Sequence, residues 1–446
     1  MRNNLFIFIL FFFTYLLPAQ KINPDIYGFA TSNTFTYCDV SDTSFLNKVI
    51  AINPQVLRFP GGAVGNFYHF GKSGYGFDFN EIDKYHNGKF PKRSRGLESS
   101  RKKKQHHQDY IDDFITLARK TQAKAVLVAN PFVEDDNDII FMIQKLYKNN
   151  IEIIGVELGS ELSNRSYFLK GYTIEDYIFF AQRCSKNIKK QFPEIKTAVV
   201  AAPLGKRKDH RHNIWNSRLS AMNFYDAIII HSYAKVIQGK AIDGQMVSED
   251  IEGKNKTEEF EIYKNRVIDY LDTEYDREVQ EYVSIYNKPI WVTEWNLQMS
   301  KTTGNTLLQS LFVTQYLLEV YSNPSLSSIE LTTYHNLGGR DFSGSIFRNN
   351  KEVLEIQSTY YPLTLLGKIF DYDIVKVEKE QSEEIFTYNC FDANNKLIIS
   401  YVIDWNKNYF RYSLEESLDK EIVHIYGSEN LFDMPNLKGE TSLEKD

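Results

Sequence analysis

The sequence of 446 residues has few cysteines, no excess of positive charge and no long apolar run beyond its N-terminal segment. The three cysteines, Cys38, Cys184 and Cys390, are odd in number and far apart, so they form neither a disulfide framework nor a zinc site. One long-range disulfide between two of them is the remaining alternative. The formal net charge is −6, whereas a nucleic-acid binder normally shows a clustered basic footprint. We therefore expect a globular protein that has no nucleic-acid partner.

The first 20 residues have the features of an export signal. Arg2 supplies a positive charge, residues 5–17 form an apolar core, and Pro18-Ala19-Gln20 is typical of a cleavage site. The apolar core is too short for a comfortable membrane span. We expect cleavage of residues 1–20 and a secreted or periplasmic protein with no stable membrane insertion; an uncleaved anchor is the alternative.

Apolar runs rich in β-forming residues alternate with helical patterns over most of the chain. The expected strands are 27–30, 55–59, 123–129, 152–158, 197–202, 227–230, 290–293 and 329–333, and the expected helices include 110–121, 138–148, 173–191 and 305–321. Eight such strands are what a (β/α)8 barrel requires. The pattern predicts an α/β fold, a TIM barrel over residues 21–370.

The pattern changes in the last part of the chain. Residues 396–404 and 409–414 alternate apolar and polar side chains, and Asn394-Asn395 supplies a turn. We expect a small β-rich, sandwich-like accessory domain over residues 371–446.

Two of the expected strands end in a glutamate. The run Ile290-Trp291-Val292-Thr293 leads into Glu294, and Ile153-Ile154-Gly155-Val156 leads through Glu157 to Glu161. An acidic side chain at the end of an apolar strand is costly unless it is paired. An exposed strand end or a structural ion pair is the simple explanation. The alternative is catalysis, because barrel enzymes take catalytic groups from the C-terminal ends of their strands.

The strand count places Glu161 after the fourth strand and Glu294 at the end of the seventh, where opposed strands can bring them together across the barrel mouth. Two carboxyl groups can cleave a glycosidic bond when their environments separate their pKa values. A gap of about 5–5.5 Å retains the anomeric configuration, whereas a wider gap admits a water molecule and inverts it. The sequence does not fix this distance.

Several motifs around these strand ends resemble a known family. They are Val56-Leu57-Arg58-Phe59-Pro60-Gly61-Gly62 followed by Asn66-Phe67-Tyr68, then Glu157-Leu158-Gly159-Ser160-Glu161, and His231-Ser232-Tyr233. Together they resemble retaining glycoside hydrolases of clan A, in particular the α-L-arabinofuranosidase and heparanase/β-glucuronidase groups. The resemblance implies that Glu161 is the acid/base and Glu294 the nucleophile, with a carbohydrate substrate and no metal or cofactor.

Six further residues are expected to bind the substrate or support the nucleophile. Arg58 can keep Glu294 ionised or form an ordinary barrel ion pair, and Asn130 can hold a sugar hydroxyl or cap the turn before Pro131. The others are expected to orient Glu294, contact the sugar or line its pocket, with core packing as the alternative for each aromatic: His231, Tyr233, Trp295 and Tyr334.

Ser160 departs from the family pattern, because the residue before the acid/base is usually an asparagine that contacts the sugar's 2-hydroxyl. The substrate then differs at its second position, a water fills the gap, or activity is low. For this reason a barrel that binds carbohydrate without cleaving it is the competing hypothesis.

Two insertions lie after expected strands. The basic run within residues 92–104 is either a solvated surface or a contact for an acidic polysaccharide, and the acidic segment 234–282 is expected to form a wall or lid of the site.

Overall fold

The computed structural model describes residues 21–443, except 33, 63–64, 73–75, 78, 86–109, 208, 243–244, 249–250, 252, 299, 301, 340–343, 351–352, 407–420 and 428–433. The predicted signal segment and the basic run 92–104 therefore lie outside the described residues. Among the helices that are described, none is long and apolar enough to cross a membrane.

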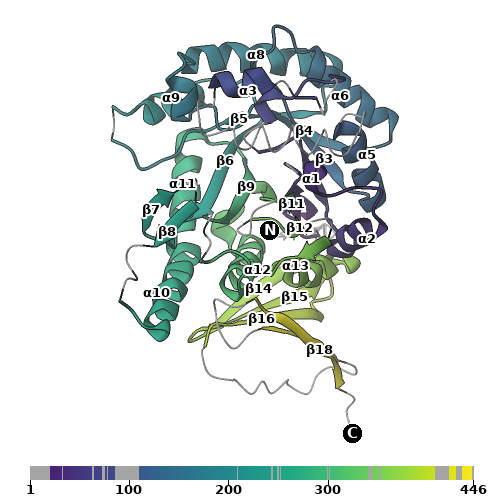
Figure 1. The fold of residues 1–446 in the computed structure, drawn as a ribbon, viewed down its shortest axis with the longest axis vertical. Helices are drawn as coiled ribbons and strands as arrows, with labels where there is room; N and C mark the ends of the chain where they lie inside the picture. The colour runs from purple at the N-terminus through teal and green to yellow at the C-terminus, as the bar shows by residue number, and fades with distance from the viewer. Residues whose placement is uncertain are drawn as a thin grey trace, which may run out of the picture.

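A closed barrel of eight parallel strands forms the centre of the molecule (Figure 1). Its strands in chain order are β1 (Gly28–Ala30), β2 (Val56–Phe59), β3 (Lys124–Val128), β4 (Ile153–Leu158), β5 (Lys196–Val200), β6 (Ala227–Ala234), β9 (Ile290–Leu297) and β10 (Ile329–Tyr334). Each strand pairs with its neighbour in this order, and β10 closes the ring on β1. The predicted fold class is confirmed, and the eight predicted barrel strands all occur.

Helices surround the barrel. They include α2 (Thr43–Ile52), α5 (Tyr110–Thr121), α6 (Asn137–Lys148), α8 (Ile174–Gln191), α9 (Arg211–Ser220), α12 (Leu307–Ser322) and α13 (Tyr360–Gly367). Their apolar faces pack inward: Ile111, Phe114 and Ala118 of α5, for example, are buried. The start of α8 is fixed by a capping box between Thr173 and Asp176.

Close packing in the barrel interior explains why the fourth strand has a glycine, Gly155. A side-chain carbon at Gly155 would lie 2.4 Å from the indole of Trp291, which reaches across from β9. The large tryptophan thus fills the space that the glycine leaves.

The long segment after β6 forms regular structure. It contains a hairpin of β7 (Gly239–Ile242) and β8 (Gln245–Ser248), then α10 (Lys256–Asp269), a single π-helical turn (Tyr270–Glu274) and α11 (Tyr275–Tyr286). Helix α11 contacts α9, so this end of the segment belongs to the outer ring of helices.

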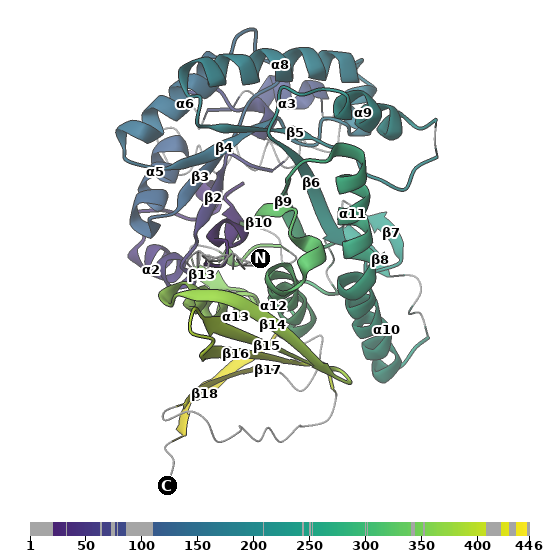
Figure 2. The same ribbon diagram turned by 180° about the vertical axis from the view of Figure 1, so that it is seen from behind.

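A separate antiparallel sheet follows the barrel, as predicted (Figure 2). It consists of β14 (Ile374–Ser382), β15 (Ile385–Asp392) and β16 (Leu397–Asp404), with a further hairpin of β17 (Glu421–Gly427) and β18 (Asn436–Leu443). The sheet docks on α12, where the Trp405 indole donates a hydrogen bond to Gln315 at 2.8 Å. The predicted strand 409–414 lies outside the described residues. All three cysteines are buried and free.

Candidate active site

Glu294 lies in β9 and points into the mouth of the barrel. Its Oε1 accepts a hydrogen bond from Arg58 Nη1 at 2.8 Å, and its Oε2 accepts one from the Tyr233 hydroxyl at 2.7 Å. The Nδ1 atoms of His231 and His335 lie 3.6 Å and 3.5 Å from the same Oε2. Three strands and the chain after β10 thus converge on one buried carboxylate.

An irregularity in the sheet places Glu294 in this position. The pairing of β9 with β6 shifts by one residue between Ile230 and His231, so Thr293 is the extra residue on β9. Thr293 faces the interior as well, since its hydroxyl lies 3.3 Å from His231 Nε2 and donates to Glu157 at 3.1 Å. The bulge therefore aims two consecutive polar side chains at the site.

Arg58 is held by a second carboxylate that is completely buried. Its Nε donates to Glu157 Oε1 at 2.5 Å and its Nη2 to Glu157 Oε2 at 2.9 Å, which leaves Nη1 for Glu294. A two-point contact of this kind fixes the plane of the guanidinium. Glu157 on β4 and Glu294 on β9 thus share one arginine on β2.

The surroundings of Glu294 favour its ionised form. Burial raises the pKa of its carboxyl, but the electrostatic effects of His231, His335 and Arg58 and the hydrogen bond from Tyr233 lower it by more. The pKa of Glu294 therefore lies well below its ordinary value of 4.5. A carboxylate that stays ionised is suited to act as a nucleophile.

Glu161 lies beyond the end of β4 in a different environment. Its φ of 51° is in the left-handed region, and its side chain is 38% exposed. Asn164 Nδ2 donates to its Oε2 at 2.8 Å, and His231 Nδ1 lies 3.0 Å from its Oε1. Glu161 is thus placed by a loop rather than by a strand, with access to solvent.

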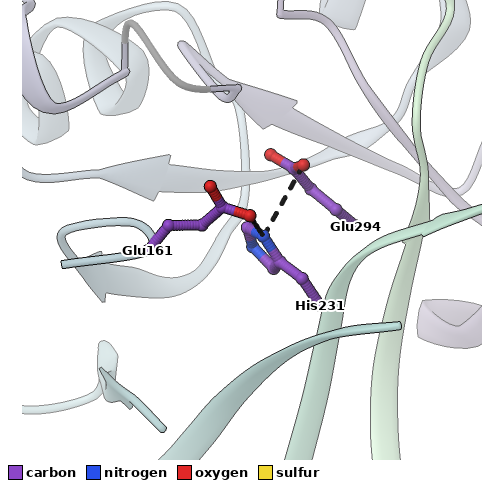
Figure 3. A group of neighbouring side chains, drawn as sticks. All are labelled: Glu161, His231 and Glu294. Carbon is purple, nitrogen blue, oxygen red and sulfur yellow. Dashed lines mark hydrogen bonds and ion pairs between the residues drawn. The ribbon is translucent and has the colours of Figure 1, made fainter. Parts of the chain in front are cut away.

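The two glutamates face each other across His231 (Figure 3). One oxygen of Glu161, one oxygen of Glu294 and one ring nitrogen of His231 all lie within 4.8 Å of one another. These two oxygens are thus closer than the about 6.5–9.5 Å that admits an attacking water, as expected of a nucleophile and acid/base pair.

The same three residues are the one group in the described part of the chain whose ligand atoms are spaced to hold a metal ion. Both oxygens of Glu294 already accept hydrogen bonds, and the Arg58 cation lies against it. The positive charge beside Glu294 favours a neutral or anionic occupant over a cation.

Ser160 is buried and bonded to the protein rather than exposed to a sugar in the site. It is 1% exposed, and its hydroxyl accepts a hydrogen bond from Arg58 Nη2 at 3.3 Å. Asn66 holds its backbone, because the amide oxygen accepts from Ser160 N–H at 2.8 Å and the amide nitrogen donates to Ser160 O at 2.6 Å. The serine therefore supports the Arg58 guanidinium.

Asn130 serves the turn rather than the site. Its Oδ1 accepts a hydrogen bond from Phe132 N–H at 2.8 Å across Pro131, and its Nδ2 donates to Tyr68 O at 3.2 Å. Of the two interpretations of Asn130, the structure supports the cap.

The prediction that Trp295 and Tyr334 line a sugar pocket is wrong. Successive residues of a strand face opposite sides, so Trp295 points outward when Glu294 points inward. Its indole is 0% exposed and stacks on Tyr316 of α12 at 4.0 Å between ring centroids, and Tyr334 packs against it at 5.2 Å. Both aromatics belong to the core between barrel and helices.

Glu157, Thr293 and Asn164 were not assigned roles from the sequence, and His335 was only a weak candidate beside Tyr334. A signal existed for Glu157, since a carboxylate in the middle of an apolar strand needs a cationic partner. Asn164 follows Glu161 in a loop without periodicity, and nothing in the pattern distinguishes it.

The fold has clear relatives among solved structures, although no model of a known protein family and no curated protein matches the sequence. The GH51 arabinofuranosidase from Xanthomonas axonopodis pv. citri has a TM-score of 0.63 and 10% identity, covering 96% of this chain and 93% of that one.

Two further arabinofuranosidases are similar in structure. The family 51 α-L-arabinofuranosidase from Bifidobacterium longum has a TM-score of 0.56 and 10% identity over 85% of this chain and 83% of its own. The α-L-arabinofuranosidase from Thermotoga maritima, solved with arabinose, has a TM-score of 0.52 and 15% identity over 95% and 93%. The chain shares the fold of these enzymes across nearly its full length.

Proposed function

We propose that this protein is a secreted retaining glycoside hydrolase that cleaves O-glycosidic bonds of a polysaccharide or oligosaccharide. The observation that carries the proposal is the pair Glu161 and Glu294, whose oxygens lie within 4.8 Å of each other at the ends of the fourth and seventh barrel strands. The similarity in fold to arabinofuranosidases makes an arabinofuranosidase-like activity the first to assay, with a glucuronidase-like activity as the alternative.

In the first step Glu161 donates its proton to the glycosidic oxygen while a carboxylate oxygen of Glu294 attacks the anomeric carbon. The bond from that carbon to the leaving oxygen breaks, and a covalent ester to Glu294 forms. Arg58 and Tyr233 hold the Glu294 carboxylate in place for the attack.

In the second step Glu161, now ionised, takes a proton from a water molecule, which attacks the same carbon. The ester breaks, the sugar leaves with its original configuration, and Glu294 returns as a carboxylate. His231 contacts both glutamates, so its imidazole lies next to the negative charge of Glu294 before the first step and next to that of Glu161 after it.

The test compares Glu294→Gln with Glu161→Gln on a panel of aryl glycosides. Glu294→Gln should lose at least about 10⁴-fold in turnover on every substrate. Glu161→Gln should lose about 10²–10⁴-fold where the leaving group needs a proton, and least where the leaving phenol is most acidic. Equal rates for both variants and the wild type would contradict the proposal.

A barrel that binds carbohydrate without cleaving it is the second candidate, because Ser160 contacts Arg58 and leaves no asparagine amide before the acid/base. A 2-fluoro sugar with a good leaving group distinguishes the two. An enzyme forms an ester at Glu294 that mass spectrometry of the peptide containing residues 290–297 detects, and a binding protein forms none.

A further inference from the structure

A group of basic residues lies on the segments that follow β4 and β5, and the first of them is close to Glu161 in the chain. Its members are Arg165, Lys206, Arg207, His210, Arg211 and His212, and we call it the cationic rim. Arg165 begins the short helix α7 (Arg165–Phe168), four residues after Glu161, and the Arg211 guanidinium donates to the carbonyl of Ser163. The rim is thus attached to the same loop that carries the acid/base.

The rim lacks anionic partners within the described part of the chain. None of its six side chains forms an ion pair there, although the protein as a whole carries an excess of acidic residues. Asp209 is the single acid among residues 206–212 and is exposed. By contrast, Arg218 farther along α9 is paired with Glu175 at 2.8 Å.

The rim's charges act on one another. Burial and the nearby charge of Arg165 lower the pKa of Arg211. Burial, together with the positive charges of Arg211, His210 and Lys206, lowers the pKa of His212 to about 4. Like charges held together without counter-charges destabilise the free protein, and an anionic ligand would relieve that repulsion.

An exposed aromatic ring lies within the rim. Phe168 is 51% exposed, and the guanidinium of Arg211 lies 5.5 Å from its ring centroid. Leu169 beside it is 66% exposed. A large apolar face next to guanidinium groups suits a sugar ring that carries an acidic substituent, since such a ligand offers both an apolar face and a charge.

We propose that the cationic rim binds an anionic sugar, bearing a carboxylate or a sulfate, on the leaving-group side of the scissile bond. The side follows from the role of Glu161, because the group that protonates the leaving oxygen must lie next to the leaving sugar. The inference rests on the proposed function for this orientation, and it restricts the substrate class to acidic polysaccharides.

The test measures binding in a Glu294→Gln background, so that no substrate is consumed. The ligands are dextran, carboxymethyl-dextran and dextran sulfate of equal length, which share one backbone and differ in their charged group. We expect both anionic chains to bind more tightly than dextran, with an affinity that falls as salt is added. The tighter of the two identifies carboxylate or sulfate as the preferred group.

The variant Arg165→Glu/Lys206→Glu should lower the affinity for the preferred chain at least tenfold. Arg119→Glu/Lys120→Glu is its matched control, because both residues are exposed at the end of α5, next to the start of β3 and so on the opposite face of the barrel. It changes the net charge equally and should leave the affinity within twofold of that of the Glu294→Gln parent.

Three results would overturn the inference: equal binding of dextran and the charged chains, an equal loss in the control, or equally tight binding of single-stranded DNA, which would mark a surface for any polyanion. These outcomes do not depend on turnover. Failure of the proposed function would appear instead as absent hydrolysis and absent trapping of Glu294 in the wild-type protein.

Discussion

The two glutamates of the site differ in how the protein holds them. Glu294 projects from a strand, and its side chain is 7% exposed, whereas that of Glu161 is 38% exposed and projects from a loop. Glu294 is fixed by Arg58 and Tyr233, which themselves lie on strands, while Glu161 is contacted by Asn164 of its own loop and by His231.

This difference suits the different requirements of a nucleophile and of an acid/base. A nucleophile must stay ionised and keep its geometry, which a rigid and fully bonded strand residue provides. An acid/base must exchange a proton with the substrate and with water, which requires contact with solvent. The protein thus separates the two tasks by placing one group inside the barrel and the other at its edge.

The largest expected effect comes from a substitution next to Arg58, which holds the buried glutamate Glu294. In Glu157→Gln the Arg58 guanidinium loses the carboxylate that holds it at two points, inside a region with no solvent to replace the charge. Breaking a buried pair by removing one partner costs about 3–5 kcal/mol. We expect a loss of that size in the free energy of unfolding, measured by denaturant titration, together with a loss of turnover.

Glu330→Gln is the matched control. Glu330 pairs with Lys196 at 2.9 Å, but their side chains are 36% and 47% exposed, so its loss should cost less than about 1 kcal/mol. If Glu157→Gln is as mild as this control, Arg58 is not anchored by Glu157, and the rigidity assigned to the nucleophile has another origin.

A smaller effect is expected at Glu161, where the backbone rather than the side chain is under strain. Its φ of 51° is unfavourable for every residue that has a Cβ and is readily adopted by glycine. Glu161→Gly should therefore be more stable than Glu161→Ala by about 1 kcal/mol. Both variants lose the same hydrogen bonds to Asn164 and His231, so their difference in unfolding free energy isolates the backbone.

Both variants should also lose acid catalysis to the same degree. Equal stability of Gly and Ala at this position would mean that the loop relaxes when the carboxylate is absent, and that the contacts of Glu161 impose its backbone conformation.

The sequence was informative where one local property decides the outcome. Eight apolar runs were enough to predict the barrel, and the strand count placed Glu161 and Glu294 at the ends of opposed strands. These predictions succeed because a buried parallel strand must be apolar and because barrel geometry brings strand ends together. Arg58 was found through the motif of residues 56–62 that resembles the glycosidase family.

The sequence was less informative where the outcome depends on the direction of a side chain. Trp295 was expected in the site because it adjoins Glu294, yet neighbouring strand residues face opposite sides, and the bulge at Thr293 decides which of them faces inward. A register shift depends on pairing with β6, and no local pattern announces it. The positive residues at 206–212 were likewise passed over, because their relation to Glu161 appears only when two loops are brought together.

The smallest expected effect concerns His231, which contacts both glutamates. Burial lowers the pKa of its imidazole, but the charges of Glu294 and Glu161 raise it by more, so its pKa in the folded protein is above the ordinary 6.5. A group of this kind contributes stability that is fully present below about pH 6.5 and is lost as pH rises through the folded pKa. The stability difference between wild type and His231→Gln should therefore shrink as pH increases.

Denaturant unfolding of both proteins between about pH 5 and pH 9 measures this difference, and taking the difference reduces the contributions of groups that both proteins share. Glu294 acts in the opposite direction, because its lowered pKa gives stability that is lost as pH falls below 4.5. A difference that grows with pH would show that His231 is neutral between the two carboxylates. The negative charge of Glu294 before the attack would then be stabilised mainly by the Arg58 guanidinium and by the hydrogen bond from Tyr233, on the buried side of the site.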